Sequence, residues 1–196
     1  MNPSLRNLAT AAVLATTCLS LTQCGNDPVT NYNAANVNPR QLAAESRAAL
    51  KKLYASNAAA RRMGPKAKGI LVFPNITKGG FMVGGMAGNG CLIRQDGTIR
   101  DFYQTAGASY GLQAGVQRYG YALFLMDDSA FRNLNRSAGW ELGSSPSLVI
   151  VDEGMSASLS NATLQASTYA FFFDQRGLMG GLGLQGSKIT RIQPPR

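Results

Sequence analysis

The hydrophobic and polar positions divide the chain into an apolar start, one helical segment and a long stretch of strands. Residues 8–21 form a continuous apolar run, after a polar start that carries one positive charge, Arg6. The run has about the length of the hydrophobic region of a secretory signal and is too short to cross a bilayer as a helix. Residues 1–23 are therefore predicted to be a removable export signal.

Cys24 follows the triplet Leu21-Thr22-Gln23 at the end of this signal. A cysteine in this position resembles the bacterial lipobox, in which the thiol is acylated and becomes the first residue of the mature chain. Gln23 departs from the pattern, which usually has Gly, Ala or Ser there. Acyl chains on Cys24 would anchor the protein firmly, because each buried methylene contributes about 0.8 kcal/mol. Lipidation is the favoured interpretation, and cleavage to a soluble periplasmic protein is the alternative.

A helix is predicted from about residue 39 to residue 62, after a flexible tether over residues 24–39 that is rich in Asn, Pro and Thr. At about 100° per residue, Leu42, Ala49 and Leu53 fall on one side of this helix, and cations fall on the other. Because the apolar stripe is thin and rich in alanine, we expect it to pack on the sheet with the cations in water. The alternative is a helix that lies on the membrane by its apolar side.

The exposed cations of this helix are the candidate lipid-binding residues. Near an anionic membrane, each Lys or Arg contributes about 1 kcal/mol to binding. Three lysines just beyond the helix enlarge the predicted basic surface. The candidates are Arg40, Arg47, Lys51, Lys52, Arg61, Arg62, Lys66, Lys68 and Lys78.

From residue 69 onward, short apolar runs and glycine-apolar alternation indicate strands. Asp96-Gly97 predicts a tight hairpin, and a short helix is expected over residues 127–136. Residues 40–196 are expected to form one α+β domain: a mostly antiparallel, glycine-rich β sheet curled into a sandwich or barrel, with an N-terminal amphipathic helix and one or two short helices. The expected strands span residues 69–73, 80–93, 98–116, 119–126, 147–151, 169–173 and 177–192.

The glycines of the strands follow even spacings, which place them on one face of a strand. We expect them to allow close packing and curvature rather than to contact a ligand. Two glycine motifs are rejected: residues 107–111 match G-x-S-x-G but have no histidine base, and residues 181–186 match G-x-G-x-x-G without room for a following helix. The evenly spaced glycines are Gly80, Gly84, Gly88 and Gly90, and then Gly107, Gly111 and Gly115.

The chain has no histidine, and this absence excludes more kinds of catalytic and metal site than any other feature of its composition. Ser–His and Cys–His nucleophile pairs and imidazole metal sites are excluded. Cys91 is the single cysteine of the expected folded domain, so a thiolate zinc site is excluded too, and we expect a buried, inert thiol there. We expect no catalytic residue, metal or cofactor. A hydrolase that uses the carboxylates of Asp127 and Asp128 is the weaker alternative.

A series of motifs between residues 40 and 192 resembles the SYLF-domain family. One departure is Asp101-Phe102-Tyr103, where many members have Trp-Ser-x-Pro. The motifs are Ala67-Lys68-Gly69-Ile70, Phe73-Pro74, Lys78-Gly79-Gly80-Phe81, Gly84-Gly85, Gly88-x-Gly90, Gly107-x-Ser109-x-Gly111-x-Gln113-x-Gly115, Tyr169, Arg176-Gly177-Leu178 and Gly180-x-x-Gly183-x-x-x-Ser187.

This resemblance implies non-catalytic lipid binding, in part through a basic N-terminal helix that maps onto Arg47, Lys51 and Lys52. Eukaryotic members bind phosphoinositides and some bind actin, while bacterial members are typically exported. With 19 Lys and Arg against 10 Asp and Glu, the expected partners are anionic phospholipids of the cell envelope, not nucleic acid. We expect an outer-membrane lipoprotein that faces the periplasm or the surface. The alternative is a structural envelope protein that binds another protein, a host protein included, or peptidoglycan.

Overall fold

The computed structural model describes residues 36–135, 139–142, 148–151, 166–177 and 187–195. The first element is helix α3 (Pro39–Ser56), which begins where the Asn38 side chain accepts hydrogen bonds from the backbone N–H groups of Arg40 and Gln41 at 3.1 and 3.2 Å. Proline at the first helical position suits this start, because its missing N–H has no partner there anyway. The predicted N-terminal helix is confirmed.

The predicted helix is divided in two at Asn57, which the sequence pattern did not indicate. The backbone N–H of Asn57 bonds to the carbonyl of Leu53 at 2.8 Å, and its side chain accepts from the N–H of Ala60 at 2.9 Å. Asn57 therefore ends α3 and caps the next helix, as a short polar side chain does when it competes with the helical ladder. The following elements are α4 (Ala58–Met63) and the 3₁₀ turn η2 (Gly64–Lys66).

Two long strands, β1 (Gly69–Arg94) and β2 (Ile99–Leu125), pair antiparallel and form most of the sheet. The turn between them contains Gly97 at φ +76°, so the predicted hairpin at Asp96-Gly97 is confirmed. The sequence pattern predicted two shorter strands in place of each long one. In the structure each strand is continuous, and the pairing shifts in register along it. The register of the β1–β2 pairing shifts between Phe73 and Ile76, between Phe81 and Val83, and between Leu92 and Ile93.

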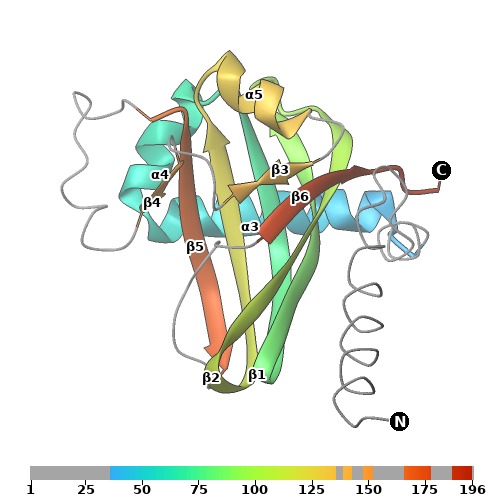
Figure 1. Ribbon diagram of the computed structural model, residues 1–196. Coiled ribbons are helices and arrows are strands. Elements are labelled where there is room, and N and C mark those ends of the chain that lie inside the picture. The colour runs from blue at the N-terminus through green and yellow to red at the C-terminus, as the bar shows by residue number, and fades with distance from the viewer. Residues whose placement is uncertain (1–35, 136–138, 143–147, 152–165, 178–186, 196) are drawn as a thin grey trace, which may run out of the picture.

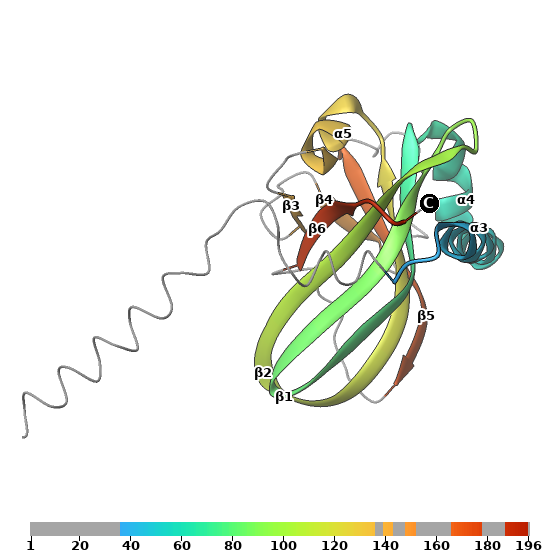
Figure 2. The same cartoon turned by 90° about the vertical axis from the view of Figure 1, so that its right-hand side faces the viewer.

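The sheet curls because β1 and β2 bend together at the lower end of the molecule (Figure 1). The first part of β2 pairs with β6 (Ser187–Ile192) and its last part pairs with β5 (Thr168–Gly177). β3 (Trp140–Glu141) adds beside β6, and β4 (Leu148–Val151) adds parallel to β5. The result is a half-barrel seen from its side in Figure 2. The predicted α+β class with a curled, mostly antiparallel sheet is confirmed.

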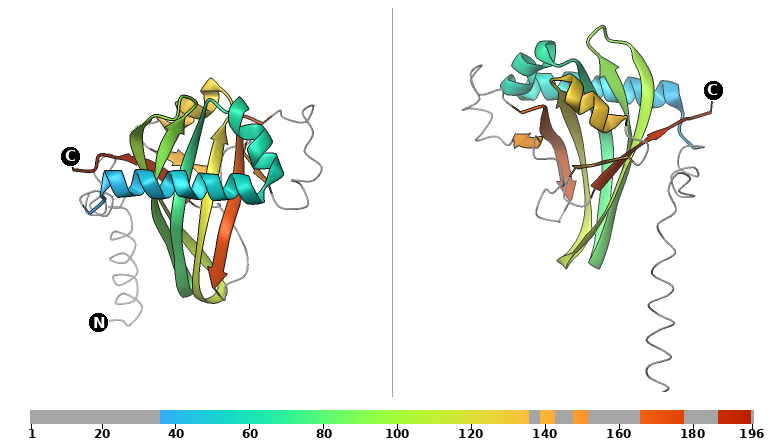
Figure 3. Two further views of the ribbon diagram at one scale, coloured as in Figure 1. Left: turned by 180° about the vertical axis from the view of Figure 1, so that it is seen from behind. Right: turned by 45° about the horizontal axis from the view of Figure 1, so that its top comes forward.

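The two faces of the sheet bury different residues. The concave face holds a cluster that includes Phe73, Tyr121 and Leu123. The convex face packs against α3, which crosses the strands as Figure 3 shows, and there Leu53 joins Phe124 in a second cluster. These two clusters and a small third one are built from residues 37–192 of the described chain. A chain that starts at residue 25 therefore retains all of their side chains.

Gly88 and Gly90 show why glycine is needed in the bent part of β1. A Cβ at Gly88 would collide with Ile76, and one at Gly90 would collide with the carbonyl oxygen of Val72 and the ring of Phe73. These glycines therefore let the two arms of β1 approach closely, as the sequence predicted.

The last helix, α5 (Asp128–Leu134), lies at the upper end of the sheet. Asp127 caps it by accepting hydrogen bonds from the N–H groups of Ser129 and Ala130 at 2.9 and 3.0 Å. The predicted helix start is confirmed, and the helix ends at Leu134. Among the described helices, none has the length and apolar character required to span a bilayer.

Candidate functional site

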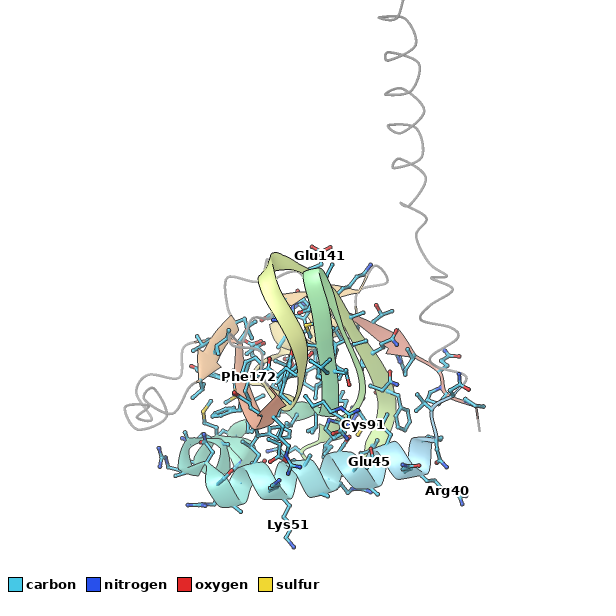
Figure 4. The ribbon with its side chains drawn as sticks, turned by 90° about the horizontal axis from the view of Figure 1, so that it is seen from below. Arg40, Glu45, Lys51, Cys91, Glu141 and Phe172 are labelled. Carbon is cyan, nitrogen blue, oxygen red and sulfur yellow. The ribbon has the colours of Figure 1, made fainter. Side chains whose placement is uncertain are left out.

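Helix α3 presents two different sides. Leu42, Leu50 and Leu53 are buried toward the sheet, whereas the cations at positions 40, 47, 51 and 52 are exposed. The expected orientation, with the apolar stripe on the sheet and the cations in water, is therefore correct. Viewed from below, Lys51 projects away from the body of the protein and Arg40 lies near the start of the helix (Figure 4).

The four α3 cations differ in how firmly they are held. A guanidinium nitrogen of Arg47 donates to the carbonyl oxygen of Gly97 at 3.1 Å, and the ammonium of Lys52 lies 2.5 Å from a carboxylate oxygen of Asp174. Within the described residues, the side chains of Arg40 and Lys51 make no hydrogen bond or ion pair. Arg40 and Lys51 are therefore the α3 cations whose charge is fully available to a partner.

The predicted cations beyond α3 lie around one end of the molecule. Arg61 on α4 donates to the carbonyl of Tyr54 at 2.8 Å, and Lys68 forms an ion pair of 2.7 Å with Asp128 at the start of α5. Arg62 and Lys66 are also exposed. The structure thus places these four cations after α3 and toward α5, not on the outer side of α3 itself.

Lys78 does not belong to the exposed basic surface. Its side chain is only 8% exposed, and it lies two residues after Ile76, whose side chain is in the concave cluster. Its partner across the strands is Gln117, also buried. Because alternate residues of a strand share a face, Lys78 points to the concave side, opposite α3.

Arg118 and Arg176 are exposed cations on the convex face that the sequence reasoning missed. They are directly opposite each other on β2 and β5. Ala122 and Phe124 lie in the convex cluster under α3, and their even spacing from Arg118 places it on the same face. That spacing was visible in the sequence, but the pairing of residues so far apart along the chain was not.

The acidic residues near the ends of the strands are engaged in structural contacts. Asp101 forms ion pairs with Arg94, at 3.6 Å, and with Arg191. The pKa of Asp127 is lowered, chiefly by the hydrogen bond from the Ser129 hydroxyl. Asp127 caps α5 and Asp128 pairs with Lys68, so both carboxylates of the hydrolase alternative have structural partners.

Cys91 is buried against α3, as the sequence predicted. Burial raises the pKa of its thiol, and this effect exceeds the opposite influence of Ser46 and Arg47. A thiol with a raised pKa has little thiolate at neutral pH, so it is a poor nucleophile. Over the described part of the chain, no three His, Cys, Asp or Glu residues come together in a group able to hold a metal ion.

The convex side of the molecule thus carries exposed cations on α3, on β2 and on β5, which can attract anions. Residues 106–193 match the model of a protein family named Ysc84 and described as Las17-binding protein actin regulator. The match includes Arg118 and Arg176 but leaves α3 outside. No curated protein matches the chain.

Proposed function

Because the chain carries a Ysc84 (SYLF) domain over residues 106–193, we propose that it binds anionic phospholipid at a bacterial envelope membrane. The Ysc84 (SYLF) family is a family of binding domains, consistent with binding of lipids or of actin-related partners. The contact is made by the outer side of α3, and no bond is made or broken. The family match supports the class of function, and the geometry of α3 supports the choice of ligand.

The observation that carries this proposal is the separation of the two sides of α3. Its leucines are already buried in the protein, so the helix has no apolar stripe left to insert into a bilayer. Its exposed cations are available for headgroups, at about 1 kcal/mol each near an anionic surface. The expected binding is therefore electrostatic and weakens as salt rises, because screening acts over about 8–10 Å at 0.1–0.15 M salt.

Delivery to the membrane is proposed to come from the lipid anchor at Cys24, which lies outside the described residues. An anchored domain meets headgroups at a high effective concentration, so weak contacts suffice. We propose that the protein is exported and held in the envelope as an outer-membrane lipoprotein. Replacing Cys24 with Ser should release the protein from the membrane fraction of cells, and unchanged membrane partition would contradict the anchor.

A protein partner is the alternative, and the printed family description supports it because it names a protein that the family binds. In this alternative the chain is a structural envelope lipoprotein that binds another protein or peptidoglycan. Cross-linking in cells separates the two proposals, since one dominant protein product would favour the alternative.

The direct test uses the chain from residue 25 onward and vesicles of phosphatidylcholine with and without phosphatidylglycerol. Co-sedimentation with the anionic vesicles at low salt, and release at high salt, is expected. Equal binding to both vesicle types would show that headgroup charge is not what the protein recognises. No binding to either would contradict the proposal.

A further inference from the structure

Arg118 and Arg176 face each other across two paired strands without an acidic partner. Both side chains are exposed, and within the described residues neither makes a hydrogen bond or an ion pair. The nearby carboxylate of Asp174 is already paired with Lys52. Like charges directly opposite each other destabilise a sheet, so the fold gains nothing from this pair. Two guanidinium groups opposite each other on paired strands can together bind the oxygens of one phosphate.

Val116 lies beside this pair on the same face and is 59% exposed, the largest exposure among the described large apolar residues. An exposed apolar side chain next to two arginines that lack an acidic partner within the described residues matches the chemistry of a membrane interface, where cations meet phosphates and apolar groups lie deeper.

We infer that Arg118, Arg176 and Val116 form a second membrane contact, in which the two arginines bind lipid phosphate and Val116 enters the interface. This inference rests on the proposed function and adds to it a site that α3 does not provide. The Lys52–Asp174 ion pair joins the end of β5 to α3, so both contacts belong to one face of the molecule. Figure 3 shows the strands continuing beyond α3 on that face.

A fluorescent label at position 116 tests the contact directly. In the chain from residue 25 onward the only cysteine is Cys91, which is buried. V116C can therefore be labelled selectively with an environment-sensitive probe such as NBD. Anionic vesicles should shift its emission to the blue, whereas the same probe at Asn135→Cys, exposed on the far end of α5, should not respond. Glycerophosphate and inorganic phosphate at equal ionic strength should give no shift, because neither has an apolar phase.

The arginines are tested by R118Q/R176Q against the matched control R132Q/K188Q, which removes the same charge from exposed positions on α5 and β6. The first variant should lose about tenfold in affinity for anionic vesicles relative to the control, from two cations near the surface. Equal affinities of the two double variants would overturn the inference and leave the α3 contact standing. A probe at V116C whose emission does not shift while the vesicles are bound would do the same. If the unmodified protein did not bind anionic vesicles, the proposed function itself would be overturned.

Discussion

The ammonium group of Lys52 lies 2.5 Å from a carboxylate oxygen of Asp174, which joins the basic helix to the end of β5. Asp174 has φ +54°, and it is the one non-glycine residue with positive φ in the described backbone. The register between β2 and β5 shifts at this point, since Arg118 pairs with Arg176 while Gly120 pairs with Phe173. The carboxylate thus sits at an irregular position of β5, on the border between the two proposed contacts.

Replacing Asp174 with Asn should strengthen binding to anionic vesicles by about threefold to fivefold, because it removes a negative charge from a basic surface and frees Lys52. Asparagine tolerates the positive φ, so the backbone can stay as it is. The free energy of unfolding should change by less than about 1 kcal/mol, since both partners of the pair are partly exposed. Vesicle titration and a denaturant melt measure the two effects. Weaker binding by D174N would show that the ion pair positions the helix for its ligand.

Replacing Lys78 with Met should stabilise the fold by roughly 1–2 kcal/mol. The Lys78 side chain is buried, and within the described residues it has no hydrogen bond or ion pair. A largely buried lysine must hold its side chain in one conformation and lose part of its hydration, which costs free energy, and methionine conserves much of the volume. Vesicle affinity should not change, because Lys78 faces the concave side. The control K188M, at an exposed position, should leave the denaturation midpoint unchanged, and a loss of vesicle affinity in K78M would contradict the placement of Lys78.

Alkaline pH should destabilise the protein through its buried tyrosines. Burial raises the pKa of Tyr103 and of Tyr119 from 10.0 to about 12. In the unfolded chain these phenols ionise near pH 10, whereas in the folded chain they stay protonated until about pH 12. The unfolded state therefore releases protons first, and stability that is complete below pH 10 falls as the pH rises from 10 to 12. Denaturant melts across this range should show the fall. Y103F/Y119F should reduce it, and the part that remains is expected from Tyr121, whose pKa is also raised by burial.

Cys91 should react slowly with DTNB in the folded protein. Its pKa is raised by burial, so little thiolate forms at pH 8, and the side chain is covered. The reaction should become fast once denaturant unfolds the chain, and V116C should supply one fast thiol in the native state. If Cys91 reacted rapidly with DTNB in the folded protein, this would show that α3 opens readily from the sheet.

Local sequence signals predicted the helix start, the hairpin and the cap of α5 because each depends on neighbouring residues. Lys78 shows where this reasoning fails. Simple alternation from Phe73, a concave residue, places position 78 on the opposite face of β1. The register shift between Phe73 and Ile76 reverses the alternation and turns Lys78 inward. The shift inserts an extra residue into β1, as a β-bulge does, and the sequence alone does not show where such a residue is inserted.

The sequence also could not show which cations share a face of the folded sheet. The α3 cations followed from helical periodicity, within one segment. Arg118 and Arg176 come together only through the pairing of β2 with β5, which is a tertiary contact. The predicted lipidation of Cys24 and the domain limits stay predictions, since Cys24 lies outside the described residues.

The central claim is that the outer side of α3 holds anionic lipid. The most direct measurement is the affinity of R40E/K51E for phosphatidylglycerol vesicles at low salt, compared with R132E/K188E, which changes the net charge by the same amount. Arg40 and Lys51 were chosen because their side chains make no hydrogen bond or ion pair with other described residues, so folding should be unaffected. The expected result is a loss of more than about tenfold in R40E/K51E and a much smaller loss in the control. Equal losses in the two variants would show that only net charge matters, and would contradict α3 as the binding surface.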